Sequence, residues 1–68
     1  MNTVTLSIPG INCGHCIMTI KREAGMVKGI QFVSGDIAGK TATFEVESEA
    51  ALVELKKALA EAGYAAAQ

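Results

Sequence analysis

The chain has 68 residues, of which half are apolar and 4% are aromatic, and its formal net charge is −1 at pH 7. This length allows one domain with a modest core, and the apolar content argues against a disordered segment. Dispersed Lys and Arg residues argue against nucleic acid as a partner. Because the sequence lacks both a membrane-spanning run and a signal peptide, we expect one cytoplasmic domain over residues 1–68, without membrane insertion.

The first third of the chain predicts a strand followed by a helix. Val4, Leu6 and Ile8 alternate with polar residues, as in a half-buried strand, and Pro9-Gly10 ends it. Asn12 or Cys13 is then in place to cap a helix that stops by Gly29. We expect its inward positions to be Ile17, Ile20, Ala24 and Val27, with Met26 packing inward at its end and Lys21, Arg22 and Glu23 outside.

The remainder predicts a hairpin, a second helix and a last strand. The hairpin pairs strands over 30–34 and 41–46 across a turn over 35–39. Ser48 caps the second helix, and Gly63 ends it. Its inward stripe is expected to contain Leu52, Leu55, Leu59 and Ala62, widened by Val53. Residues 64–67 form the last strand. The order β-α-β-β-α-β predicts an α+β two-layer sandwich with both helices on one face of a four-stranded antiparallel sheet.

Cys13 and Cys16 stand where the first strand gives way to the first helix, in the run Cys13-Gly14-His15-Cys16. A disulfide between two cysteines this close would not hold the fold together, because the loop that it would close is very short. The amino end of a helix lowers the pKa of a thiol there, which favours the thiolate that binds metals. Two thiolates select soft ions, above all Cu(I), and also accept Zn(II), Cd(II) or Hg(II).

The number of ligands indicates a carrier rather than a structural site. A structural zinc site uses four protein ligands, whereas this motif offers two, or three if His15 takes part. An incomplete set of ligands lets a partner's thiolate add to the ion before one of the chain's own leaves. No general base or carboxylate pair accompanies the thiols, so we do not expect an enzyme.

Other interpretations of these residues remain open. Cys-Gly-His-Cys is also a redox sequence, although no Trp precedes Cys13 and no second Pro is present. A role of the two cysteines as small apolar packing residues is another interpretation. We expect His15 to be an exposed loop residue rather than a ligand within one chain, with a metal-bridged homodimer as the arrangement in which it reaches a second site. Met18 and Met26 are expected to fill space rather than bind copper.

The motif Gly10-Ile11-Asn12-Cys13-Gly14-His15-Cys16, the order of elements and the Gly63-Tyr64 ending resemble the heavy-metal-associated domain, and within it the small bacterial copper chaperones. The resemblance implies a ferredoxin-like fold and delivery of Cu(I) to a copper-transporting P-type ATPase or its metal-binding domain. It implies that Ile11, standing where the family usually has Met, packs under the metal loop, and that Tyr64 approaches the thiolates. Asn12 replaces the family's common Thr or Ser, and Gly14 and His15 complete the loop.

The same resemblance leaves alternatives for the function. A mercury or zinc carrier would have the same fold and the same thiol pair. A metal-binding domain of a larger transporter and a small thiol-disulfide oxidoreductase are the other two possibilities.

Overall fold

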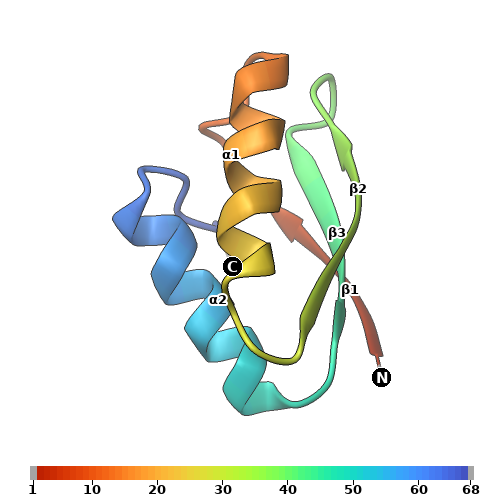
Figure 1. Ribbon diagram of the computed structural model, residues 1–68. Coiled ribbons are helices and arrows are strands. Elements are labelled where there is room, and N and C mark those ends of the chain that lie inside the picture. The colour runs from red at the N-terminus through yellow and green to blue at the C-terminus, as the bar shows by residue number, and fades with distance from the viewer. Residues whose placement is uncertain (1, 68) are drawn as a thin grey trace.

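Within residues 2–67, which the computed structural model describes, the chain forms three strands and two helices. In order they are β1 (Asn2–Ser7), α1 (Gly14–Gly25), β2 (Ile30–Asp36), β3 (Thr41–Val46) and α2 (Glu49–Glu61). The strands form one antiparallel sheet in the order β1-β3-β2. Both helices lie on the same side of this sheet (Figure 1). The predicted α+β sandwich is therefore confirmed in its layers, although the sheet has one strand fewer than expected.

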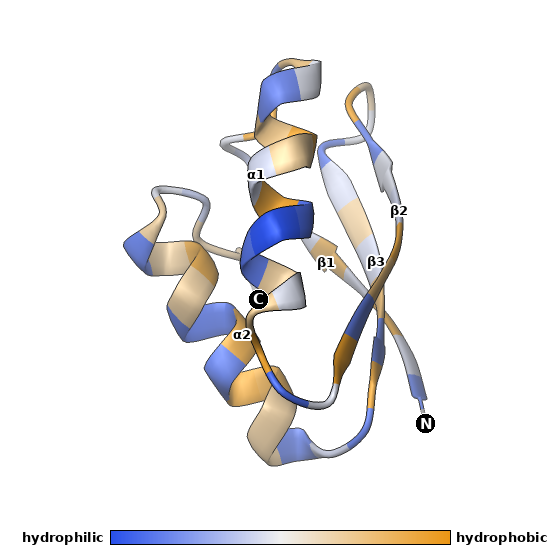
Figure 2. Ribbon diagram, viewed as in Figure 1, coloured by the Kyte–Doolittle hydropathy of each residue, from blue (hydrophilic) through white to orange (hydrophobic). Residues whose placement is uncertain are grey.

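The core lies between the helices and the sheet, and it is built from aliphatic side chains around one ring. Along β3, Ala42, Phe44 and Val46 are buried and the residues between them are half-buried, so these three residues form the inward face of the strand. Apolar and polar residues alternate along the elements in Figure 2. The largest fully buried side chains are Phe44, Ile8, Ile11, Ile20, Leu55 and Leu59. Ile8 and Ile11 lie in the cysteine loop, the segment over residues 8–13 that joins β1 to α1, so the core supports that loop directly.

The helix caps explain where the helices begin. Ser48 caps α2 as predicted, since its Oγ accepts a hydrogen bond of 3.3 Å from the Ala51 N–H. Cys13 is the residue before α1, with an extended backbone (φ −162°, ψ 172°). Its side chain makes no capping hydrogen bond, which leaves the thiol available for other chemistry.

Two predicted inward positions are wrong. Val53 is 62% exposed because successive residues of an α-helix are about 100° apart, so a residue midway between buried Ala51 and Leu55 points away from the core. Ala51 is buried in its place. Met26 is 69% exposed because it is two residues, or about 200° of helical rotation, from buried Ala24 and so points away from the core.

Strand β2 contains a bulge that obscures its pattern in the sequence. The pairing with β3 shifts between Phe32 and Ser34, so Val33 is an extra residue and lies 52% exposed. Phe32 faces the core before the bulge, where its ring meets Phe44 edge-on at 5.7 Å. After the bulge, Gly35 occupies an inward-facing position opposite Ala42, and it packs against Ile17 of α1. The strand also runs to Asp36, so the turn spans 37–40 rather than the predicted 35–39.

The predicted fourth strand over 64–67 does not form. A single hydrogen bond of 2.7 Å, from the Ala67 N–H to the Ser7 carbonyl, joins this segment to β1. Alanine side chains bury little area and have low strand propensity, which explains why the pairing goes no further within the described residues. Gly63 does end α2 as predicted, with φ 91°. In the same part of the chain, residues 2–67, no helix has the length and apolar character needed to span a membrane.

Candidate metal centre

The two cysteines lie side by side at the amino end of α1. Their Sγ atoms are 3.6 Å apart, and both thiols are free. The Cys13 carbonyl accepts a hydrogen bond of 3.1 Å from the Cys16 N–H, which begins the helix and brings the two residues onto one turn. A metal–thiolate bond is about 2.3 Å long, so two sulfur atoms closer than about 4.6 Å are able to contact one ion. The pair meets this condition.

The two sulfur atoms have different surroundings. Cys16 is 5% exposed and packs in the core, whereas Cys13 is exposed. The Cys16 thiol donates toward the Asn12 Oδ1 at 3.4 Å and the Gly10 carbonyl at 3.7 Å. The site thus has one thiol fixed by the protein and one facing solvent.

Tyr64 approaches this site from the end of α2. The Gly63 N–H donates to the Ala60 carbonyl at 3.1 Å and the Tyr64 N–H to the Leu59 carbonyl at 2.7 Å, which is the pattern of a Schellman motif. This motif turns the chain back toward the cysteine loop. The Tyr64 ring lies over Gly10, where a Cβ atom would be 3.3 Å from Tyr64 Cδ1. This contact brings the Tyr64 ring to the start of the loop that carries the cysteines.

The surroundings favour the thiolate of Cys16. The Tyr64 hydroxyl is the largest cause, followed by the Asn12 backbone, and together with Cys13 they lower the pKa of Cys16 to about 7, although burial opposes this. The interaction also raises the pKa of Tyr64 above its ordinary value. The first turn of α1 contains no acidic residue that would oppose the anion.

The other loop residues have distinct positions. Ile11 is 0% exposed and belongs to the core cluster, so it packs inward as expected. Gly14 and Asn12 are exposed, and a Cβ atom at Gly14 would meet no atom within 4 Å. His15 is also exposed, on the first turn of α1.

Neither His15 nor Met18 completes a larger set of ligands. Among residues 2–67, no three His, Cys, Asp or Glu side chains gather closely enough to hold one ion. Met18 is 67% exposed. The arrangement therefore offers two sulfur ligands, both from the motif.

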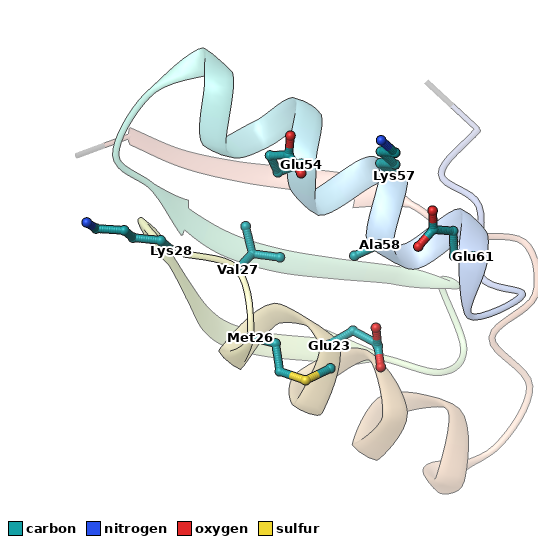
Figure 3. A pocket seen from close by; sticks show the side chains of 8 residues that line it. All are labelled: Glu23, Met26, Val27, Lys28, Glu54, Lys57, Ala58 and Glu61. Atoms are coloured by element: carbon teal, nitrogen blue, oxygen red, sulfur yellow. The ribbon is translucent and has the colours of Figure 1, made fainter.

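A surface groove of about 550 Å³ lies elsewhere, between α1 and α2. Figure 3 shows Glu23 and Met26 on one wall and side chains of α2 on the other. Its lining consists of Glu23, Met26, Val27, Lys28, Glu54, Lys57, Ala58 and Glu61, so it contains neither cysteine. A two-ligand ion site needs no pocket, and the chemistry of the thiols locates the site better than the groove does.

Two residues have roles at the loop that the sequence pattern does not reveal. Gly10 is expected at the end of β1 and in the motif, and the structure adds that a Cβ atom there would crowd the Tyr64 ring, at 3.3 Å from Cδ1. Lys40 was not singled out, yet its Nζ donates to the Pro9 carbonyl at 3.4 Å. The pairing of the turn with the loop is not visible in the local sequence.

Comparison with known proteins decides the family, because the heavy-metal-associated domain profile matches residues 5–65. The chain belongs to the heavy-metal-associated domain family. It is 32% identical over 60 residues to the COP-associated protein of Helicobacter pylori strain J99, covering 88% of this chain and 91% of that protein. It is 38% identical over 64 residues to the mercuric transport protein periplasmic component of Shigella flexneri, covering 91% and 69%.

A solved structure supports both the fold and the family. Oxidized MerP from Ralstonia metallidurans CH34 superimposes with a TM-score of 0.82 and 34% identity, covering 97% of this chain and 93% of that one. The ferredoxin-like arrangement of this heavy-metal-associated domain is thereby supported, although its own sheet has three strands within the described residues. As a member of the family, the chain is a metal-binding domain for soft heavy metals.

Proposed function

We propose that this domain carries one Cu(I) ion between proteins in the cytoplasm, bound by the thiolates of Cys13 and Cys16. The observation that supports this most directly is the pair of free sulfur atoms 3.6 Å apart, one buried and one exposed. Two thiolates with no carboxylate beside them are a soft donor set, which favours Cu(I) over harder ions. The domain acts as a carrier, not as an enzyme.

The unequal exposure of the two thiols suggests an order of transfer. An incoming thiolate of a partner forms a bond to the ion beside exposed Cys13, so the ion briefly has three sulfur ligands. The bond to Cys13 then breaks, and that thiolate becomes free to take up a proton from water. A second thiolate of the partner then binds the ion, and Cys16 leaves last because its sulfur is buried. No bare ion is released at any step.

The proposed partner is a copper-transporting P-type ATPase or its metal-binding domain. The resemblance to bacterial copper chaperones supports this choice. Exposed Cys13, Gly14 and Asn12 give such a partner access to the ion. A metal-bridged homodimer is the competing arrangement, in which a second copy of the chain supplies the additional ligands.

Mercury is the second candidate cargo. Both the Shigella flexneri relative, named as a mercuric transport protein, and oxidized MerP support it, and Hg(II) is also a soft ion with high affinity for thiolates. Zn(II) is less suited to two ligands, because zinc sites in proteins use three or four. A mercury carrier would act on the same two sulfur atoms.

A competition titration tests the proposal. The reduced protein is titrated anaerobically with Cu(I) against a Cu(I) chelator, and separately with Hg(II) and Zn(II). We expect one Cu(I) per chain with tighter binding than Zn(II), and loss of tight binding in Cys13→Ser and in Cys16→Ser. His15→Ala is the matched control, since His15 lies between the two cysteines, and it should bind as the parent does. Failure of the parent to take up Cu(I), or tight binding by either serine variant, would contradict the proposal.

A further inference from the structure

The β2–β3 turn contains a residue whose backbone conformation disfavours its own side chain. Lys40 has φ 56°, and no other non-glycine residue among residues 2–67 has a positive φ. Glycine adopts this conformation without strain, whereas a side chain with a Cβ atom does so at a cost. Such outliers persist where the surrounding structure holds them, and they cluster at functional sites. The contacts of the Lys40 side chain therefore need an explanation.

Lys40 contacts the start of the cysteine loop twice. Its carbonyl accepts a hydrogen bond of 2.8 Å from the Ile8 N–H, and its Nζ donates to the Pro9 carbonyl at 3.4 Å. The next carbonyl along the chain, that of Gly10, accepts from the Cys16 thiol at 3.7 Å. Lys40 thus binds the Pro9 carbonyl, and the next carbonyl, that of Gly10, faces the buried Cys16 sulfur.

The loop is held from a second direction by Tyr64. Its ring packs over Gly10, where the Gly63 carbonyl also lies 3.4 Å from the position of a Cβ atom. Figure 1 shows the β2–β3 turn and the loop that leads into α1 at the same end of the molecule. Pro9 and Gly10 therefore lie between two segments that are distant in sequence, and the Lys40 side chain provides a charged contact on one side.

We propose that Lys40 is a positioning residue that fixes Pro9 and Gly10, and thereby slows the release of the ion from Cys13 and Cys16. The inference rests on the proposed function, because it concerns the same two sulfur atoms. Loss of the ion requires Cys16 to separate from it, and a loop held at Pro9 resists the displacement of the Gly10 backbone beside that sulfur. The contact between Lys40 and Pro9 explains why a lysine has a backbone conformation that suits glycine.

The test measures the rate at which Cu(I)-loaded protein loses copper to excess bicinchoninate. Lys40→Met keeps a long side chain but removes the donor, and we expect release to become about two- to fivefold faster, as for the loss of one weak hydrogen bond. Lys40→Arg restores a charged donor and should release copper at the parent's rate. Lys28→Met is the matched control, since Lys28 is exposed and lines the groove between the helices, not the loop.

A further variant separates positioning from simple stabilisation. Lys40→Gly removes the side chain and the backbone strain together, so its urea midpoint should rise while its copper release becomes as fast as that of Lys40→Met. If Lys40 acted only through the stability of the fold, the more stable Lys40→Gly would instead release copper more slowly than the parent. Release at the parent's rate in Lys40→Met or Lys40→Gly, or release by Lys40→Arg as fast as by Lys40→Met, would overturn the inference.

The two proposals fail in different ways in this experiment. If the parent and Lys28→Met do not hold Cu(I) at all, the proposed function is wrong. If both hold Cu(I) and Lys40→Met releases it no faster, the function stands and the role of Lys40 is wrong.

Discussion

Tyr64 lies so close to Gly10 that a Cβ atom on Gly10 would be 3.3 Å from the Tyr64 ring. This contact brings the end of α2 to the loop that carries the cysteines, and the Tyr64 hydroxyl is the largest cause of the lowered pKa of Cys16. The site is therefore assembled from both ends of the chain. Its chemical properties depend on residues outside the motif.

Replacing Tyr64 with phenylalanine isolates the contribution of the hydroxyl. Tyr64→Phe keeps the ring against Gly10 but removes the group that stabilises the Cys16 thiolate, so the pKa of Cys16 should rise from about 7. Ultraviolet absorbance of the thiolate, followed as pH is varied in the reduced protein, measures this value. The Cys13→Ser background assigns the transition to Cys16. An unchanged pKa would show that Tyr64 does not act on this thiol.

The lowered pKa of Cys16 also predicts how stability depends on pH. Because folding lowers this pKa from 9.0 to about 7, the thiolate's contribution to stability is complete above pH 9.0 and is lost as pH falls through about 7. As the pH is lowered from 9.0 to below about 7, the free energy of unfolding of the reduced parent should therefore decrease relative to that of Cys16→Ser. Urea unfolding at a series of pH values measures it. A difference that is independent of pH would contradict the lowered pKa.

Leu55 and Val53 form a matched pair on α2. Leu55 is fully buried, so Leu55→Ala should lower the free energy of unfolding by roughly 2–5 kcal/mol through lost burial and a cavity. Val53 is 62% exposed, so Val53→Ala should change it by about 0.5 kcal/mol or less. Urea unfolding of the reduced proteins measures both. A loss of less than about 1 kcal/mol in Leu55→Ala would mean that this helix face is not the core face.

Gly63 links the end of α2 to the site. Its φ of 91° strains any residue with a Cβ atom, although no atom lies within 4 Å of where that Cβ would be. We therefore expect Gly63→Ala to lower the free energy of unfolding by about 1 kcal/mol from strain alone. The displaced Tyr64 should raise the pKa of Cys16 at the same time. Gly14→Ala is a useful comparison, since its Cβ also enters open space but its backbone φ is not positive.

Local sequence signals predicted the parts of the fold that depend on local chemistry. Ser48 and Gly63 mark the ends of α2 because their roles are a side-chain cap and a left-handed backbone, which neighbouring residues determine. The resemblance identified the family and the cysteine loop. The bulge at Val33 and the lack of strand pairing over 64–67 were not predictable in this way, because both depend on pairing between distant segments. The contact of Lys40 with Pro9 is of the same kind.

The most direct test of the two-sulfur site is X-ray absorption at the copper edge of the Cu(I)-loaded, reduced protein. The account predicts one ion per chain bound by the sulfur atoms of Cys13 and Cys16, with a signal that does not change in His15→Ala or when Met18 is replaced by leucine. A spectrum that requires a nitrogen ligand lost in His15→Ala, or a sulfur ligand that persists when both cysteines are replaced by serine, would contradict it.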